Sequence, residues 1–235
     1  MLLHGLTCNA AYWLRVAPLL DGLRVVALDL RGHGLSAHRD SYGYADYESD
    51  LLALLDDLGL ERAAVAGHSL GGYVALLAAS RSDRVGPVLA VDVKSDWTDA
   101  DADLAARSRG AAQRVEPERA VLVDRLARTI PSEAAPELDV LAERSIEAVD
   151  DGWRFRWDRR VLATEPVDPF AFLPAVRSPA AVMAGAESGV MPPAAAERFA
   201  AAIPGAVLEV IAGVGHHVEL EAPEAVAARI RELVA

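Results

Sequence analysis

The sequence predicts an α/β fold, in which a mostly parallel sheet carries helices on both of its faces. Two observations predict it. Short aliphatic runs alternate with longer helical patterns along most of the 235 residues. The aliphatic runs are mostly apolar at consecutive positions, which is typical of strands buried on both faces rather than on one. Buried strands that alternate with helices indicate a parallel sheet with covered faces.

The first half of the chain contains two predicted strands and two predicted helices. Residues 24–29 and 62–67 are short aliphatic runs and are expected to be buried strands. Residues 46–58 place leucines at helical spacing, and Gly59 is a typical helix stop. Residues 70–79 follow the second run and predict another helix. The order strand, helix, strand, helix is that of a parallel α/β sheet.

The second half resumes the same alternation after one interruption. Pro223 suits the first turn of a final helix, because the missing N–H of proline has no partner there in any case. The other expected elements are strands at 87–92, 180–184 and 206–211, and a helix near 193–202.

The interruption covers residues 95–168, where we find helical patterns and almost no strand. We interpret it as a helical cap over the carboxyl ends of the strands, where open α/β sheets bind ligands. The α/β core then comprises residues 1–94 and 169–235. The alternative is a second layer of core packing. Trp97, Trp153 and, from the first loop, Trp13 are the aromatic residues expected to bind substrate.

Composition excludes several classes of function. The chain has 23 Lys and Arg against 35 Asp and Glu, a net charge of −12. This balance argues against nucleic-acid and anionic-lipid surfaces, which require basic patches. The sequence shows neither an export signal nor an uncharged run of membrane-spanning length, so we expect a cytoplasmic protein. The single cysteine, Cys8, forms no internal disulfide or multi-cysteine zinc site and is expected to be a buried filler.

The segment Gly67-His68-Ser69-Leu70-Gly71 fits the pattern Gly-x-Ser-x-Gly and lies between a predicted strand and a predicted helix. In such a turn the serine has a strained backbone, and its neighbours must be small so that the chains can pass. The turn lifts the Ser69 hydroxyl clear of the sheet, at a helix N-terminus that favours negative charge. Ser69 is therefore the predicted nucleophile.

A serine hydroxyl needs a base and a site for the oxyanion. His216 is the predicted base, because it follows Gly213-Val214-Gly215 in a loop that can approach Ser69. The backbone N–H groups of Leu6 and Leu70 are the predicted oxyanion donors, by position alone. Among the rival histidines, His4 and His68 are beside glycines and are expected to fix turns, and His217 is expected to point elsewhere. The remaining two, His33 and His38, are in the loop after the strand at 24–29.

In these residues the chain resembles the α/β-hydrolase superfamily, in its serine-nucleophile branch with a helical cap. The resemblance covers essentially the whole chain and is specific for the fold, much less so for the substrate. It implies a structural loop around Asp29 and Arg31, without a catalytic role. The matching motifs are His4-Gly5, Asp29-x-Arg31-Gly32-x-Gly34-x-Ser36, Gly67-His68-Ser69-Leu70-Gly71-Gly72, and Gly215-His216 with Glu221-x-Pro223.

The chain departs from the family in its first strands. Members usually have two further strands, and most of a third, before the His-Gly loop, whereas here only Met1-Leu2-Leu3 precede it. The strand at 24–29 is then expected to lie at a sheet edge, which invites strand addition. We expect upstream residues or a partner to cover this edge.

The second departure concerns the acid that supports the histidine. The usual family position, in a Gly-x-x-Asp turn after the strand at 180–184, holds Ser188 here. A serine cannot stabilise an imidazolium as a carboxylate does. Asp92 ends the neighbouring strand, where some family branches carry their acid, and we favour it. Glu187, one residue early in the usual turn, remains the alternative.

The expected activity is that of a serine hydrolase cleaving small carboxylic esters or lactones through an acyl-enzyme on Ser69. No metal or organic cofactor is implied, and the chain is expected to be a monomer or homodimer. The alternatives within the fold are a carbon–carbon bond hydrolase and a cofactor-free haloperoxidase. A hydrolase-fold binding protein with little turnover is the alternative outside enzymes.

Overall fold

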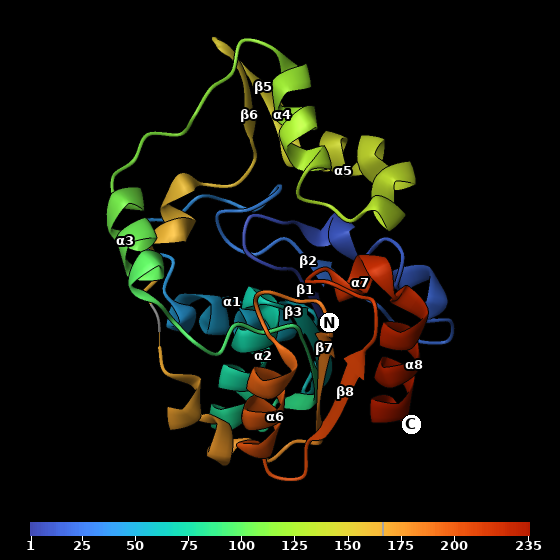
Figure 1. Ribbon diagram of the computed structural model, residues 1–235. Coiled ribbons are helices and arrows are strands. Elements are labelled where there is room, and N and C mark those ends of the chain that lie inside the picture. The colour runs from blue at the N-terminus through green and yellow to red at the C-terminus, as the bar shows by residue number, and fades with distance from the viewer. Residues whose placement is uncertain (166) are drawn as a thin grey trace.

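A six-stranded parallel sheet forms the centre of the molecule in the computed structural model, which describes residues 1–165 and 167–235 (Figure 1). The strand order is β2-β1-β3-β4-β7-β8, and every neighbouring pair is parallel. The predicted fold class is confirmed. The strands are β1 (Leu2–Leu3), β2 (Ala27–Leu28), β3 (Ala63–His68), β4 (Val85–Val91), β7 (Ala180–Gly185) and β8 (Val207–Ile211).

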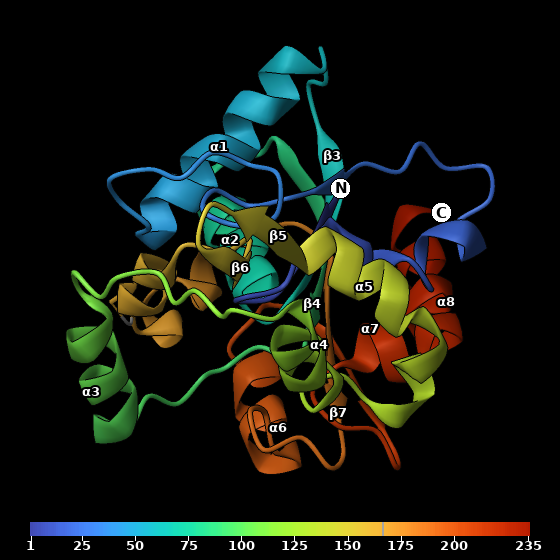
Figure 2. The same cartoon turned by 90° about the horizontal axis from the view of Figure 1, so that it is seen from above.

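Helices cover both faces of this sheet (Figures 1 and 2). Helices α1 (Tyr44–Asp57), α2 (Leu70–Arg81) and α6 (Pro193–Ala201) lie on one face and share a core with it. Helix α8 (Pro223–Val234) and the segment that follows β1 cover the other face. Across the described residues, no helix has the length and apolar character that crossing a bilayer requires.

The strand predicted at 24–29 is wrong in both extent and burial. Only Ala27 and Leu28 pair with a neighbour, and Arg24 and Ala27 are exposed. The physical reason is its position. Strand β2 is at the edge of the sheet, as expected, and its single neighbour β1 is just two residues long. The ladder therefore cannot extend along the whole aliphatic run.

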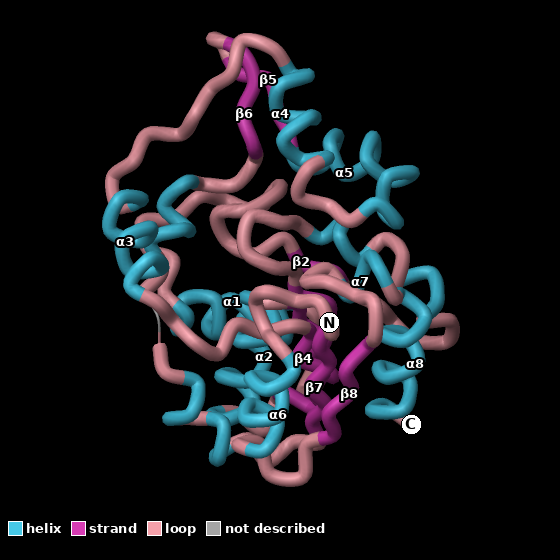
Figure 3. The backbone as a smooth tube through the Cα atoms, viewed as in Figure 1, coloured by secondary structure: helices cyan, strands magenta, loops and turns pink. Residues whose placement is uncertain are grey.

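The interruption between β4 and β7 contains helices α3 (Asp99–Ser108), α4 (Arg119–Ala127) and α5 (Leu138–Ser145). It also contains an antiparallel hairpin, β5 (Ile146–Val149) and β6 (Gly152–Phe155), drawn at the top of Figure 3. The expectation of almost no strand is wrong here. The turn residues Asp150 and Asp151 lead into Gly152, whose φ of +141° suits glycine alone. The Asp-Gly pair was the hairpin signal in the sequence.

Candidate active site

Ser69 lies at a sharp turn between β3 and α2. Its φ of +48° and ψ of −113° are strained for a residue with a side chain. A Cβ on Gly67 would lie 2.2 Å from the carbonyl carbon of Gly71, and a Cβ on Gly71 would lie 2.4 Å from the backbone oxygen of Leu3. The glycines of the motif are therefore required because strand, helix and β1 pass each other in contact.

His216 lies in the loop after β8, against the end of β4. Its Nδ1 is 2.7 Å from Oδ1 of Asp92. The carboxylate of Asp92 is fully buried, and its backbone has a φ of +48°, like that of Ser69 on the neighbouring strand. Because a carboxylate only accepts hydrogen bonds, this contact places a proton on Nδ1 and leaves Nε2 free to accept one.

The Asp92 carboxylate has two further donors. The Ser188 hydroxyl donates to Oδ1 at 2.6 Å, and the backbone N–H of Gly185 donates to Oδ2 at 3.0 Å. Ser188 is itself buried and accepts from the backbone N–H of Val190. Glu187, the alternative acid, is exposed. The structure thus brings Asp92 to His216 and turns Glu187 toward solvent.

The loop that carries His216 approaches the sheet closely. A Cβ on Gly185 at the end of β7 would lie 2.0 Å from the backbone oxygen of Gly215. Gly213 has a φ of +72°, which permits the turn out of β8. The backbone N–H of Gly215 donates at 2.8 Å to Glu221 at the end of the short helix α7 (Val218–Glu221). These contacts fix the position of the His216 backbone.

Ser69 and His216 line one cavity of about 250 Å³. Trp97 from the predicted cap also lines it, as expected for a substrate-binding residue. Trp13 and Trp153 do not. Trp13 packs in the core beneath the opposite face of the sheet, and Trp153 packs on the hairpin among residues of α4 and α5. The apolar lining also includes Tyr44, Tyr73, Val93, Leu104, Val161 and Leu162.

The charges in this cavity are paired. Lys94 Nζ is 2.5 Å from Oδ1 of Asp101 and 5.4 Å from the ring centre of Trp97. The Lys94 ammonium and the Thr98 hydrogen bonds lower the pKa of the Asp101 carboxyl, although burial opposes them. The pair is consequently close to neutral, and the lining favours uncharged ligand groups.

The predicted oxyanion donors border the same cavity. Leu6 and Leu70 both line it. The backbone N–H of Leu70 is in the first turn of α2, where helix N–H groups have no partner within the helix. Within residues 1–165 and 167–235, the backbone hydrogen bonds include neither the Leu6 nor the Leu70 N–H. Both groups are available to a ligand oxygen.

The other buried histidines are bonded to backbone. His4 Nε2 accepts from the N–H of Leu30, and His33 Nε2 accepts from the N–H of Thr7. Burial lowers the pKa of His4 to about 4 and that of His33 to about 3, so both are neutral at pH 7. The same loop holds Asp29, which accepts from the N–H groups of Ala10 and Leu35 and supports the chain rather than the cavity.

Two residues at this site escaped sequence reasoning. Ser188 supports the carboxylate of Asp92, although the sequence shows it only as a missing aspartate. Lys94 borders the cavity with its partner Asp101. The signal for Lys94 was its place two residues after Asp92, at the carboxyl end of β4, where sheets of this kind bind ligands.

Comparison with known families gives a match over almost the whole chain. The model of a family described as "Alpha/beta hydrolase family" matches residues 1–229.

Individual relatives agree with that match. The chain is 30% identical over 235 residues to 2-(acetamidomethylene)succinate hydrolase of Mesorhizobium japonicum, covering 94% of this chain and 82% of that protein. It is 29% identical to Esterase YbfF of Escherichia coli, covering 91% and 83%. Among solved structures, E-2-(acetamidomethylene)succinate hydrolase superposes with a TM-score of 0.86 at 27% identity, covering 99% of this chain and 90% of the other.

Proposed function

The chain belongs to the alpha/beta hydrolase family, and from this we propose that it is a serine hydrolase that cleaves small, uncharged carboxylic esters or lactones. Relatives named as esterases and hydrolases support the general class. One observation carries the proposal. Ser69, which has a strained backbone, borders the same cavity as His216, and Nδ1 of His216 is hydrogen-bonded to the buried Asp92.

The proposed first step is attack of the Ser69 hydroxyl on the substrate carbonyl. Nε2 of His216 accepts the hydroxyl proton, and the Asp92 carboxylate stabilises the imidazolium that forms. The bond between Ser69 Oγ and the carbonyl carbon forms as the carbonyl oxygen becomes negative. The N–H groups of Leu6 and Leu70 donate to that oxygen, and such donors are each worth about 3–4 kcal/mol.

The second step releases the alcohol and then the acid. Collapse of the tetrahedral intermediate breaks the ester bond, and the imidazolium returns its proton to the leaving oxygen. His216 then takes a proton from water as the water oxygen attacks the acyl carbon. Collapse of this second tetrahedral intermediate breaks the bond to Ser69 Oγ, the imidazolium returns its proton to that oxygen, and the carboxylic acid is released. The chain's own residues supply every proton transfer in this scheme.

The proposed substrate class follows from the cavity. Its volume of about 250 Å³ and its aromatic and aliphatic lining suit a short apolar acyl or alcohol group. The relative named for a succinate derivative acts on a dicarboxylate, whereas the Lys94 side chain here is paired with Asp101. We therefore favour neutral substrates over dicarboxylates.

We assign residues 95–168 as the cap of this site. Trp97, Asp101 and Leu104 line the cavity from one end of the segment, and Val161 and Thr164 line it from the other. Residues at both ends of the insertion therefore contact the space above Ser69. This arrangement supports a role in substrate selection, with the core carrying the bond-breaking groups.

A fluorophosphonate probe tests the nucleophile, and a substrate panel tests the class. We expect rapid labelling of the wild type and none of Ser69→Ala, while the exposed control Ser132→Ala labels normally. Turnover should be higher on p-nitrophenyl acetate and butyrate or on small lactones than on a succinate half-ester. A folded protein that neither labels nor turns over these substrates would instead be a binding protein of this fold.

A further inference from the structure

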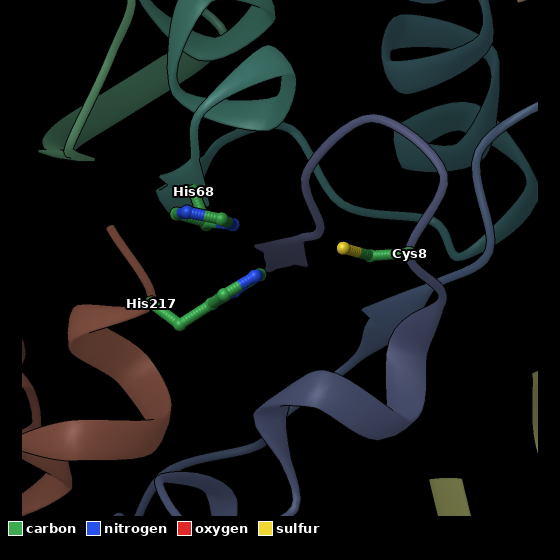
Figure 4. A group of neighbouring side chains, drawn as sticks. All are labelled: Cys8, His68 and His217. Atoms are coloured by element: carbon green, nitrogen blue, oxygen red, sulfur yellow. The ribbon is translucent and has the colours of Figure 1, made fainter. Parts of the chain in front are cut away.

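A group of possible metal ligands lies next to the proposed active site, where the ring centre of His68 is 4.5 Å from that of His216. Cys8, His68 and His217 each offer one possible metal-binding atom, and these atoms lie within 4.8 Å of one another (Figure 4). Cys8 comes from the loop after β1, His68 ends β3, and His217 precedes α7. Cys8 and His68 are buried, and the His217 side chain is 16% exposed.

The His68 ring presents an unbonded nitrogen to this group. Its Nε2 is 3.0 Å from the backbone oxygen of His216, which can only accept, so Nε2 carries a proton. Its Nδ1 is then a lone-pair acceptor in the neutral ring. That atom is buried without a hydrogen-bond partner among the described residues, and it lies 3.3 Å from Oε1 of Glu219, a carboxylate that has no proton to donate. A buried acceptor left without a donor is unfavourable, and a bound cation would satisfy it.

The His217 ring, like that of His68, presents one of its nitrogens to this group of side chains. Its Nδ1 is 3.0 Å from the carboxylate of Glu219, which is fully buried. This contact leaves Nε2 for the space between His68 and Cys8, toward which the ring points in Figure 4. A carboxylate on the far nitrogen is the usual partner of a metal-binding histidine, because it fixes the ring and raises its basicity.

We propose that Cys8, His68 and His217 form a binding site for one zinc-like divalent metal ion, with Glu219 orienting His217. A site with one thiolate and two imidazoles binds zinc in preference to magnesium or calcium, which favour oxygen ligands. The thiolate and the Glu219 carboxylate together balance the two positive charges. Ligands in a tetrahedral zinc site are about 3.3–3.8 Å apart, so the three side chains must close by roughly 1 Å.

Binding has a defined proton balance. The Cys8 thiol is buried and donates to the backbone oxygen of Leu6 at 3.6 Å, so it carries a proton in the metal-free protein. Formation of the sulfur–metal bond therefore breaks the S–H bond and releases one proton to solvent.

The ion would join three segments that are distant in sequence. Cys8, His68 and His217 come from the beginning, the middle and the end of the chain. One of the joined rings, His68, is also bonded to the backbone of His216. The site would thus brace the loops that hold Ser69 and His216 without taking part in the proposed acyl transfer.

Cobalt titration of chelator-treated protein tests the site directly. We expect one Co²⁺ per chain, with a thiolate-to-cobalt charge-transfer band and release of one proton. Zn²⁺ should displace the cobalt and raise the melting temperature, whereas Mg²⁺ should do neither. Cys8→Ser should lose the charge-transfer band, and His217→Gln should weaken cobalt binding at least tenfold. His38→Gln, which changes an exposed histidine, should bind as the wild type does.

The proposal is overturned if the folded wild type shows no charge-transfer band, or if Cys8→Ser retains it. It is equally overturned if His38→Gln removes binding and His217→Gln does not. Circular dichroism of each metal-free variant separates lost binding from lost folding. Should both ligand variants fail to fold, alkylation of Cys8 in the wild type decides, because bound Zn²⁺ must slow it and Mg²⁺ must not.

Discussion

The Ser188 hydroxyl lies 2.6 Å from Oδ1 of Asp92 and donates a hydrogen bond to it. The two residues follow neighbouring parallel strands, β7 and β4, which pair over Val88–Val91 and Ala180–Met183. Ser188 stands where the family usually has its acid, yet it contacts the carboxylate offered by the next strand. The bond explains how a serine at this position is compatible with a complete set of proton-transfer groups.

Asp92→Asn should lower kcat by about 10⁴-fold, because an amide cannot hold His216 in the required tautomer or stabilise its charged form. Glu187→Gln is the matched control, since Glu187 is exposed and should change kcat less than twofold. Steady-state hydrolysis of a p-nitrophenyl ester measures both. Near-normal turnover of Asp92→Asn would remove Asp92 from the proposed mechanism.

Moving the acid between the two strands is a stricter test. Asp92→Asn combined with Ser188→Asp should recover at least tenfold of the activity lost by Asp92→Asn alone, because a carboxylate then returns to the neighbourhood of His216. Ser188→Asp alone should be poorly active or unstable, since it buries two like charges in contact. If the double variant is no better than Asp92→Asn, β7 cannot supply the acid in this chain.

Gly67→Ala should destabilise the fold by about 1–3 kcal/mol or more, because its Cβ would meet the backbone of α2 at 2.2 Å and backbone cannot move aside cheaply. Gly189→Ala is the control, because no heavy atom lies within 4 Å of its Cβ. Urea unfolding measures the free-energy difference. Equal stability of the two variants would contradict the close crossing of strand and helix.

Trp97→Leu should lower kcat/KM for a butyryl ester about tenfold, because one wall of the cavity recedes from the acyl chain. Trp153→Leu, which changes a tryptophan of the hairpin, should leave this value within twofold. Comparing acetyl with hexanoyl esters shows whether the preferred chain length shifts. An effect of Trp153→Leu equal to that of Trp97→Leu would count against the assigned lining.

Acid should weaken the fold through its buried histidines. In the folded chain the pKa of His4 is about 4 and that of His33 about 3, against an ordinary value of 6.5. The unfolded chain therefore binds more protons, and stability falls as pH drops from about 6.5 toward 4 and 3. For His4 the loss is about 3 kcal/mol.

Urea unfolding at pH 7 and pH 4.5 measures this dependence. His4→Gln should reduce the difference in unfolding free energy between the two pH values. Ser132→Ala is the control, because it changes an exposed residue that does not titrate in this range and should leave the difference unchanged. An unaltered pH dependence in His4→Gln would show that other groups dominate acid unfolding.

Local signals in the sequence carried much of the fold. The elbow at Ser69 was predictable because its glycines and its strand and helix are contiguous. The hairpin after Ser145 was not, because its strands are short and the Asp-Gly turn is a weak signal within a helical segment. The strand at 24–29 was overextended because pairing depends on the length of its neighbour, which the aliphatic run does not encode.

The candidate site likewise has features that the sequence could predict and others that it could not. The position of Trp13 under the sheet depends on the path of the chain after β1, so its aromatic character alone suggested the wrong neighbours. The contact between Asp92 and His216 joins residues 124 positions apart and depends on strand order. Sequence spacing could nominate Asp92 and Glu187 together, but only the folded chain shows which of them contacts the histidine.

The register of the central strands also determines where the proposed catalytic side chains lie. His68 is opposite Val91, and Val91 is opposite Met183, so Ser69 and Asp92 each lie one step beyond a matched position. A slip of a single position between β4 and β7 would displace Asp92 by about 3.3 Å relative to the loop after β8 that carries His216, and would reverse the face its side chain occupies. Alignment of the backbone ladder, as much as any side chain, therefore sets whether the acid reaches its imidazole.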